Sequence, residues 1–481
     1  MITSPAFSGK RYAVLGLARS GLATVEALLA SGARVTAWDD REDARAKAKD
    51  AASKLHPGTG RGTMRSMVEG APNLAQPPLH HSPAANGPPP RPGEDLLEIA
   101  DPLTIDLTGY DSVVVSPGVP LNKHPIAAHA AKAGVPVIGD IELFAQARPS
   151  LPPHKVVGIT GTNGKSTTTA LIHHILETAG IPTEMGGNIG LPILAQDPLP
   201  AGGIYVLELS SYQIDLTYSL DCDVAVLLNV TPDHLDRYES FEAYRGSKLR
   251  LFEMQSRAGA AILFGHDDQA DPEAMTLYLP ALVEAVIGHE AITEFQNELE
   301  RAQGNWPALQ GPHNLQNVRA AAAAAQVLGV EADIIGRSLR TYPGLPHRMQ
   351  RVAEKNGILF INDSKATNPD STAPALAAYP YIHWIVGGRA KTDSLGPCEA
   401  QLGHVRAAYT IGESGPMFAR LLEGRVPVTE SGVLPAAVSD AARAAAPGEV
   451  VLLSPACASF DQFRDYEARG EAFRAAVEAL A

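Results

Sequence analysis

A glycine-rich segment at residues 158–169, GITGTNGKSTTT, constrains the fold of this chain more than any other stretch of its sequence. A short apolar run beginning at Lys155 precedes the segment, and apolar residues at helical spacing follow it within residues 167–179. The order of strand, glycine-rich turn and helix predicts a phosphate-binding loop, because the N–H groups of such a turn and of a helix N-terminus attract anions. We therefore predict a site for a nucleoside triphosphate.

The spacing of the glycines differs from that of the usual phosphate loop, since Ile159 stands where the first glycine would be. The loop nevertheless ends in Lys165 and Ser166, which we expect to contact the terminal phosphates and a Mg²⁺ ion. The alternative is a glycine-rich turn before an ordinary helix, and the strand and helix around the segment favour the phosphate site. The glycines of the segment are Gly158, Gly161 and Gly164.

The length and charge of the chain limit the classes of protein to which it can belong. Its 481 residues predict two to four domains. Its formal net charge of −14 argues against a protein that binds nucleic acid or a membrane surface through bulk charge. Anionic ligands must then be bound by local features, such as helix N-termini and single Lys or Arg side chains.

Cysteine usage and the absence of targeting patterns predict a reducing compartment. The three cysteines form no CxxC pair, so we expect neither a disulfide framework nor a cysteine-based zinc site. The sequence begins without a basic-then-apolar signal pattern and contains no run of 18 apolar residues. We therefore predict a cytoplasmic location. The cysteines are Cys222, Cys398 and Cys457.

Residues 11–40 read as a strand, a turn, a helix over residues 22–30 and a second strand. The turn, GLARSG at residues 16–21, is a variant of the GxGxxG fingerprint, and Asp39 follows at the position of a ribose-binding acid. Taken alone, this unit indicates a nicotinamide or flavin site. Ala18 replaces the middle glycine and would crowd a pyrophosphate, and many nucleotides use this arrangement, so the unit alone does not decide which nucleotide binds.

Residues 50–100 interrupt this pattern with nine prolines between Pro57 and Pro92. We predict a surface insertion in which His80 and His81 are solvated rather than metal ligands. The α/β pattern then resumes with a strand in DSVVVSPGVP, a helix over residues 126–133 and a strand in VPVIGD. The first domain is predicted to end near Pro152, where two prolines precede the strand of the phosphate loop.

The second α/β unit contains two strands that end in polar residues. The apolar run IYVLEL ends at Glu208, where phosphate-loop enzymes place an acid near Mg²⁺. The run DVAVLLNV leads to TPDHLDRY, which places His234 at the carboxyl end of a strand, where open α/β sheets bind ligands. A helix over residues 241–252 carries Lys248, which helical spacing alone predicts to be solvated. A further helix over residues 311–329 contains six consecutive alanines.

The last third of the chain alternates strands and helices again, with strand candidates in ILFIND, YIHWIVGG, AAYTIG and EVVLLSP and a terminal helix from Gly470. Polar clusters follow three of these strands, at residues 363–368, 387–391 and 454–461. The predicted fold is α/β with three domains. These are a Rossmann-like domain at residues 1–152, a central phosphate-loop domain with a parallel sheet at residues 153–346, and a second Rossmann-like domain at residues 347–481.

Ten stretches of the sequence resemble the ATP-dependent Mur ligases of bacterial cell-wall synthesis. They occur in order across nearly the whole chain, and only the proline-rich insertion lies outside the resemblance. The last three point to the branch of the family that adds D-glutamate, with NDSKATN the most specific. The stretches are GITGTNGKSTTT, GGNIG, LELSSYQ, NVTPDHLDRY, the lysine of GSKLRLF, GPHNLQN, LPHR, NDSKATN, GGRAK and LLSPACASFDQFRDYEARG.

The resemblance implies a reaction that fits the residues. A Mur ligase of this branch would use ATP to phosphorylate the carboxylate of UDP-N-acetylmuramoyl-L-alanine, and the amine of D-glutamate would attack the acyl phosphate. Two Mg²⁺ ions are implied, one of them bound by a carbamate formed from Lys248 and CO₂. The transferred phosphoryl group needs positioning and positive charge rather than a protein nucleophile. We expect a monomer that binds these small molecules and neither nucleic acid nor membrane.

The resemblance also implies a role for each matching position. Catalysis would rest on Lys165, Glu208, His234, Lys248 and Arg348. ATP would contact Gly161, Thr162, Asn163, Gly164, Lys165, Ser166, Thr167, Asn317, Arg348 and Asp363. The UDP substrate would contact Arg19, Ser20, Asp39, Arg41, Gly118, Asn188 and His234. D-Glutamate would contact Thr367, Lys391, Ser459 and Tyr466. The metal ions would be bound by Ser166, Glu208, His234 and the carbamate of Lys248.

Two other classes of protein fit parts of the sequence. An NAD-dependent oxidoreductase would use the first βαβ unit but leaves the phosphate loop, Glu208 and the third domain unexplained. A nucleotide-gated binding protein, which hydrolyses ATP as a switch, would explain the central domain but not the polar strand ends of the third. The interpretation as a Mur ligase accounts for residues in all three domains.

Overall fold

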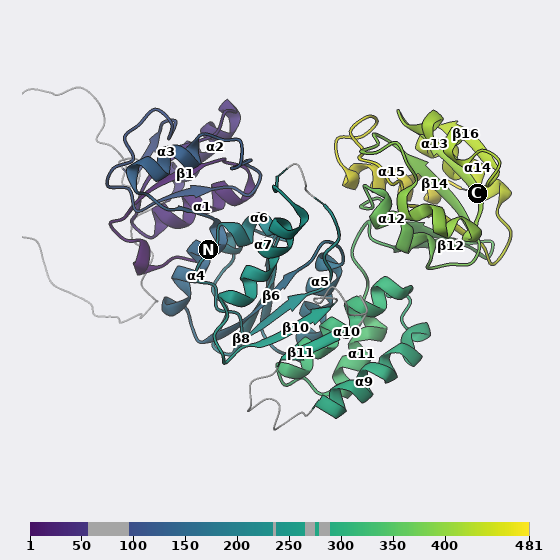
Figure 1. The fold of residues 1–481 in the computed structure, drawn as a ribbon, viewed down its shortest axis with the longest axis horizontal. Helices are drawn as coiled ribbons and strands as arrows, with labels where there is room; N and C mark the ends of the chain where they lie inside the picture. Colours follow the sequence, from purple (N-terminus) through teal and green to yellow (C-terminus); the bar gives the residue numbers. More distant parts are fainter. Residues whose placement is uncertain (56–95, 234–236, 265–274, 279–288, 481) are drawn as a thin grey trace, which may run out of the picture.

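The computed structural model describes residues 1–55, 96–233, 237–264, 275–278 and 289–480. It contains three sheets that follow one another along the chain and form three lobes, with the second lobe between the other two (Figure 1). This arrangement confirms the predicted α/β class with three doubly wound units. The predicted insertion at residues 50–100 is too wide at both ends, because residues 50–54 belong to a helix and residues 97–99 to a strand of the first sheet. Residues 56–95, with His80 and His81, lie outside the described residues, so the prediction for them stays untested.

The first sheet is parallel and has the strand order β3-β2-β1-β4-β5. The predicted helix over residues 22–30 begins three residues earlier, because the turn after β1 enters the helix directly at Arg19. The strands are β1 (Arg11–Leu15), β2 (Arg34–Trp38), β3 (Leu97–Ile99), β4 (Ser112–Val115) and β5 (Val137–Ile138). The helices are α1 (Arg19–Ala30), α2 (Glu42–Lys54), α3 (Ile126–Ala133) and α4 (Asp140–Ala147).

The central sheet has the order β11-β10-β9-β6-β8-β7 and is parallel except for the β10–β11 pair. Strand β6 is in the middle of this sheet, and the phosphate loop follows its carboxyl end. The strands are β6 (His154–Thr160), β7 (Thr183–Gly187), β8 (Gly203–Glu208), β9 (Val224–Leu227), β10 (Ala260–Phe264) and β11 (Met275–Tyr278). The helices are α5 (Lys165–Thr178), α6 (Ser211–Asp215), α7 (Phe241–Glu253), α9 (His289–Ala302), α10 (Pro312–Val327) and α11 (Ala332–Thr341).

The third sheet has the order β12-β13-β17-β14-β15-β16, in which only the β12–β13 pair is antiparallel. The edge strands β12 and β16 were not predicted, because they are only partly buried and lack an apolar run. The strands are β12 (Gln350–Lys355), β13 (Ile358–Asn362), β14 (Ile382–Gly387), β15 (Val405–Ile411), β16 (Val428–Gly432) and β17 (Val450–Leu453). The helices are α12 (Pro369–Leu376), α13 (Gly415–Leu422), α14 (Leu434–Ala444) and α15 (Tyr466–Glu478).

Helices α10 and α15 show how particular side chains determine the packing of one helix and the start of another. The alanine-rich helix α10 occupies nearly the predicted range, and its six alanines are fully buried beside helix α5. Small side chains allow this close packing of helices against each other. The terminal helix α15 begins four residues before the predicted Gly470, because the side chain of Asp465 accepts a 2.7 Å hydrogen bond from the Ala468 N–H and caps it.

The first and central lobes share a buried interface. The carboxylate of Glu142 on α4 accepts hydrogen bonds from the backbone N–H groups of Tyr218 and Ser219 at 2.7 and 2.9 Å. The hydroxyl of Ser219 donates a third bond at 2.7 Å. Phe144 packs edge-to-face on Tyr205 of the central sheet, with ring centroids 5.1 Å apart. One hydrophobic cluster therefore continues from the first sheet into the second.

A glycine next to Glu208 provides a test of this architecture. Gly187 has a φ of +86°, and a Cβ built on it would lie 2.2 Å from the backbone oxygen of Glu208. Gly202 has the same φ of +86° but no heavy atom within 4 Å of such a Cβ. Gly202→Ala should therefore cost only the left-handed strain of about 1 kcal/mol. Gly187→Ala should lower the melting temperature by more than Gly202→Ala does, because backbone atoms at Glu208 must move to admit the new Cβ. Equal melting temperatures of the two variants would contradict this packing.

Candidate functional site

The phosphate loop is held by hydrogen bonds from the end of the neighbouring strand β9. Asn229 accepts from the Thr162 N–H with its backbone oxygen and from the Asn163 N–H with its side-chain oxygen, both at 2.8 Å. Its side-chain amide donates to the Asn163 carbonyl at 3.1 Å. Gly164 is the N-cap of α5 with a φ of +87°, which favours glycine. The loop thus delivers Lys165 and Ser166 in the first turn of the helix.

Two lysines donate to the same carbonyl of this loop. Lys165 Nζ donates to the Gly161 and Thr162 oxygens at 2.8 Å each, and Lys248 Nζ donates to the Gly161 oxygen at 2.8 Å. Lys248 is only 1% exposed and lies 4.5 Å from the centroid of the Tyr244 ring. The reading of Lys248 as a solvated helix lysine is therefore wrong. Helical spacing could not reveal that α7 turns this position toward the phosphate loop.

Burial changes the acid–base properties of both lysines. Desolvation, and then the charge of Lys165, lower the pKa of Lys248 to about 6. Desolvation also lowers the pKa of Lys165, partly offset by the attraction of Glu208. At neutral pH the Lys248 amine is therefore largely neutral, which is the nucleophilic form of a lysine.

Glu208, at the end of β8, has the features of a metal ligand. The side chain is 2% exposed, and its Oε1 accepts a 2.8 Å hydrogen bond from Asn188 Nδ2. Its Oε2 is buried and has no hydrogen-bond partner among the described residues. A buried carboxylate oxygen without a partner is costly unless a cation occupies its surroundings. The donor set of Glu208 and the Ser166 hydroxyl therefore fits a Mg²⁺ ion that shares further oxygens with phosphates and water.

The predicted second metal site is only partly described. His234 lies outside the described residues, and its assignment stays a prediction. Within the described part of the chain, no three His, Cys, Asp or Glu side chains form a metal-binding group. Mg²⁺ usually takes one or two protein carboxylates together with phosphate and water, so it does not require such a group.

An arginine of the third lobe reaches the phosphate loop. Arg348 Nη2 donates a 2.7 Å hydrogen bond to Ser166 Oγ, which joins two residues 182 positions apart. The residues on either side of it, His347 and Met349, have φ values of +61° and +45°. Non-glycine residues in this region are uncommon and cluster at functional sites. Arg348 therefore lies beside the phosphate loop, and its contact with a phosphate of ATP stays a prediction.

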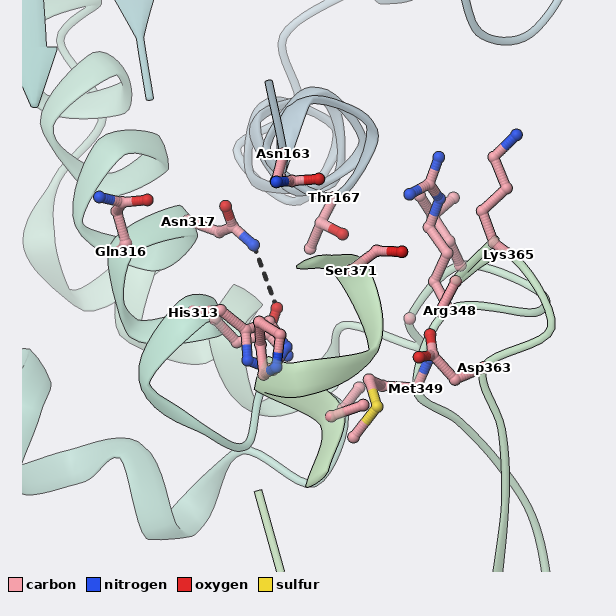
Figure 2. Close-up of a pocket in the computed structure, with 18 of the residues that line it drawn as sticks. Asn163, Thr167, His313, Gln316, Asn317, Arg348, Met349, Asp363, Lys365 and Ser371 are labelled. Atoms are coloured by element: carbon pink, nitrogen blue, oxygen red, sulfur yellow. Dashed lines mark hydrogen bonds between the residues drawn. The ribbon is translucent and has the colours of Figure 1, made fainter. Parts of the chain in front are cut away.

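A cavity of about 120 Å³ lies beside the loop, with walls from the central and third lobes (Figure 2). Asn317 on α10 donates to Asn314 Oδ1 at 3.1 Å and accepts from Thr168 Oγ1 at 3.2 Å. In Figure 2, Arg348 and Lys365 lie on the opposite side of the cavity from Asn317. Asn163, Gly164 and Thr167 line it as well. Six of the ten predicted ATP contacts therefore line one cavity, and they include the residues assigned to the adenine, the ribose and part of the phosphates.

Asp363 occupies the third-lobe wall of this cavity. It is 7% exposed, and it accepts hydrogen bonds from the Met349 N–H at 3.1 Å and from Ser454 Oγ at 2.8 Å. Burial raises the pKa of its carboxyl to about 7. The predicted ribose contact of Asp363 is compatible with this place, because a carboxyl of either protonation state can accept a hydrogen bond from a hydroxyl.

A larger cleft of about 1230 Å³ is lined by residues of all three lobes. Most of the predicted substrate positions meet here, and they come from segments that are far apart in the sequence. Arg41 and Ser459 do not line it. The predicted residues that do are Arg19, Ser20, Asp39, Gly118, Thr162, Asn163, Gly164, Lys165, Ser166, Asn188, Glu208, Arg348, Thr367, Lys391 and Tyr466.

The first-lobe wall of the cleft is held by internal hydrogen bonds. Asp39 accepts from the Leu17 N–H at 2.7 Å and from the backbone and side chain of Arg41 at 3.0 Å. Burial alone would raise the pKa of Asp39, but the bonds from Arg41 and Leu17 hold it below the ordinary value. Arg19 Nη2 donates to the Gly190 oxygen of the central lobe at 2.5 Å. Arg41 thus supports Asp39 from outside the cleft.

The third-lobe wall includes a lysine that the predicted site set omitted. Lys365 of the NDSKATN stretch lies 3.9 Å from the centroid of the Tyr466 ring and lines both the cleft and the smaller cavity. Burial, and then the charge of Arg348, lower its pKa. Its place between Asp363 and Thr367 could have indicated it. Ser459, by contrast, is buried at 2% exposure, away from the cleft lining.

Comparison with known proteins agrees with this geometry. The family model described as the Mur ligase middle domain matches residues 159–325, and the one described as the Mur ligase glutamate ligase domain matches residues 347–457. Two curated relatives are both named UDP-N-acetylmuramoylalanine--D-glutamate ligase. The one from Novosphingobium aromaticivorans is 58% identical over 100% of this chain and 97% of its own length. The one from Sphingopyxis alaskensis is 56% identical over the full length of both chains.

A solved structure shows the same fold at much lower identity. The UDP-N-acetylmuramate-alanine ligase MurC from Thermotoga maritima superposes with a TM-score of 0.51 at 15% identity, over 98% of this chain and 99% of the other. The phosphate loop, the three α/β lobes and the cleft between them define a three-domain nucleotide-dependent ligase. The chain belongs to the Mur ligase family, whose members use ATP. Among the described helices, none is long and apolar enough to cross a membrane.

Replacing Lys165 tests the phosphate loop. Lys165→Ala should lower ATP turnover by roughly a hundredfold or more, because it removes a charge directed at the phosphates. The melting temperature should stay close to that of the wild type, since the substitution removes a positive charge near Lys248 and Arg348. Lys155→Ala, on an exposed position of the same strand–loop unit, is the matched control and should keep full turnover. Wild-type phosphate release by a folded Lys165→Ala variant would end the assignment.

Proposed function

We propose that this chain adds D-glutamate to UDP-N-acetylmuramoyl-L-alanine in the synthesis of peptidoglycan precursors. ATP phosphorylates the terminal carboxylate of the UDP substrate, the amine of D-glutamate attacks the acyl phosphate, and ADP and phosphate leave. The observation that carries the proposal is the hydrogen bond from Arg348 to Ser166, which brings the third lobe onto the phosphate loop. The names of the relatives at 58% and 56% identity support the choice of substrates.

The first half of the reaction needs positive charge around a transferred phosphoryl group. Lys165, Arg348 and Lys365 line the same cleft, in a chain whose net charge is −14. These residues neutralise charge that develops on the phosphate oxygens, and the glycine-rich turn positions the nucleotide. Ser166 and Glu208 would hold a Mg²⁺ ion, which would supply additional neutralisation of the phosphate oxygens.

The second half needs a free amine beside an activated carbonyl, protected from water. Thr367, Lys391 and Tyr466 line the cleft on the third-lobe side and hold D-glutamate in this proposal. Gly118, Ser20 and Arg19 line it on the first-lobe side and hold the uridine part of the other substrate. Three lobes around one cleft limit the access of water to the acyl phosphate. Asn188 contacts Glu208 and would link the metal site to the UDP substrate.

The proposal extends to the state and location of the protein. One chain provides all three walls of the cleft, so we propose that it acts as a monomer. The three cysteines are free thiols in buried positions, as a reducing compartment requires. This supports the predicted cytoplasmic location.

An assay of ADP release decides between this function and its rivals. The wild-type chain should release ADP only when UDP-N-acetylmuramoyl-L-alanine and D-glutamate are both present, and L-glutamate should not replace D-glutamate. ADP release that needs neither substrate would indicate the nucleotide-gated switch. Substrate-dependent oxidation of NADH without ADP release would revive the oxidoreductase.

The proposed carbamate on Lys248 gives a pH-dependent prediction. The neutral amine attacks CO₂, a C–N bond forms and a proton leaves, so the product is an anionic oxygen ligand suited to Mg²⁺. With a pKa of about 6, the amine is mostly neutral above that pH and mostly protonated below it. A ¹³C carbamate signal from labelled bicarbonate should therefore be present at pH 8 and disappear below about pH 6.

Two variants complete this test. Lys248→Ala should be nearly inactive and lack the signal, and acetate should restore part of its activity by filling the position of the carbamate. Lys155→Ala should keep both the signal and the activity. Full activity of the wild type after prolonged removal of CO₂, with loss of the adduct verified by mass spectrometry, would contradict the prediction.

A further inference from the structure

An arginine of the central lobe donates two hydrogen bonds to a turn of the first lobe. Arg237 Nη1 donates to the Val119 oxygen and Nη2 donates to the Gly118 oxygen, both at 3.2 Å. The two nitrogens of one planar guanidinium therefore bind two consecutive carbonyls of a segment 118 positions away. Arg237 lies in the NVTPDHLDRY stretch, for which the site residues assigned above include only His234.

The turn that Arg237 contacts lines the larger cleft. Ser116, Gly118 and Val119 all line the cleft, on the wall to which we assign the uridine substrate. The Val119 N–H donates to the Ser116 oxygen at 3.0 Å, and the Ser116 hydroxyl donates to the Gly16 oxygen at 2.7 Å. The turn is thus tied to the glycine-containing loop after β1 on one side and to Arg237 on the other.

Aromatic rings fix the guanidinium itself. Its Cζ lies 4.4 Å from the centroid of the Tyr212 ring on α6, a cation–π distance. Tyr212 stacks on Tyr238, with ring centroids 6.1 Å apart and an interplanar angle of 12°. The Tyr238 hydroxyl donates to Asp215 at 2.8 Å and lies 3.3 Å from the hydroxyl of Ser247, the residue before Lys248. Arg237 therefore connects the first-lobe turn to α6, which follows the strand of Glu208, and through Tyr238 to α7, which carries Lys248.

We propose that Arg237 is a positioning residue that sets the place of the Gly118 turn relative to the phosphate loop, and with it the affinity for the UDP substrate. The inference rests on the proposed function, because it takes the first-lobe wall as the uridine side of the cleft. A lysine cannot replace the arginine here, since a single ammonium lacks the planar fork that reaches two carbonyls and stacks on a ring. Arg237 contacts the turn on the uridine side and not the phosphate loop, so its loss weakens substrate binding equally in the ground state and the transition state. Such a loss raises the KM for the UDP substrate and leaves kcat nearly unchanged.

The test compares substrate and nucleotide binding in the full-length chain. Arg237→Lys and Arg237→Ala should raise the Kd for UDP-N-acetylmuramoyl-L-alanine, measured by calorimetry without ATP, by about tenfold or more. The KM for that substrate should rise in parallel. The Kd for ADP, the KM for ATP and the kcat at saturating substrate should stay within about threefold of wild type. This split separates positioning from a general loss of structure, which would change all five quantities.

Arg250→Ala is the matched control. Arg250 also donates to two carbonyls, those of Asp215 and Thr217 at 3.2 and 3.1 Å, and lies over a tyrosine ring, but all its partners belong to the central lobe. It should keep the wild-type Kd for the UDP substrate. An unchanged Kd in the Arg237 variants, or an equal rise in Arg250→Ala, would overturn the inference. A wild-type chain that fails to bind UDP-N-acetylmuramoyl-L-alanine would instead overturn the proposed function, and the inference with it.

Discussion

The hydrogen bonds that two lysine side chains donate to the carbonyl oxygen of Gly161 are the interaction on which the site depends. Lys165 follows the phosphate loop and Lys248 lies on helix α7, and each donates at 2.8 Å. Arg348 adds a guanidinium at Ser166. Desolvation lowers the pKa of both lysines, and the charge of Lys165 lowers the pKa of Lys248 further. The positive charges of Lys165 and Arg348 therefore lie beside a Lys248 amine that is mostly uncharged, an arrangement that suits an anion at the loop.

The rest of the fold keeps this cationic centre in place. The segment after strand β9 supplies Asn229, which satisfies two N–H groups of the loop. Strand β8 supplies Glu208, whose second oxygen is without a partner among the described residues. Close approach of the backbone at Gly187 brings Asn188 against that carboxylate. Parallel strands that end at the same edge of a sheet make such convergence possible, because loops after different strands face the same space.

Contacts between the lobes bring residues of all three α/β units together at one site. The first lobe is joined to the second by apolar packing, by the three hydrogen bonds to Glu142 and by Arg237. The third lobe reaches the loop through Arg348, whose neighbours His347 and Met349 hold left-handed backbone conformations. A segment with two such residues stays in this conformation only where its surroundings hold it.

The sequence by itself determined the phosphate loop, the three α/β units and the family, because these depend on local order: an apolar run, a glycine turn and a helix pattern. It also placed Glu208 correctly at a strand end, since strand ends follow from where an apolar run stops. It did not reveal the edge strands β12 and β16, which lack apolar runs because one side of each remains in solvent. Only the tertiary structure decided that Lys248 is buried, that Asn188 contacts Glu208, and that Arg237 reaches Gly118. Each of these facts depends on which distant segments meet around a polar side chain, and the periodicity of one segment carries no information about its partners.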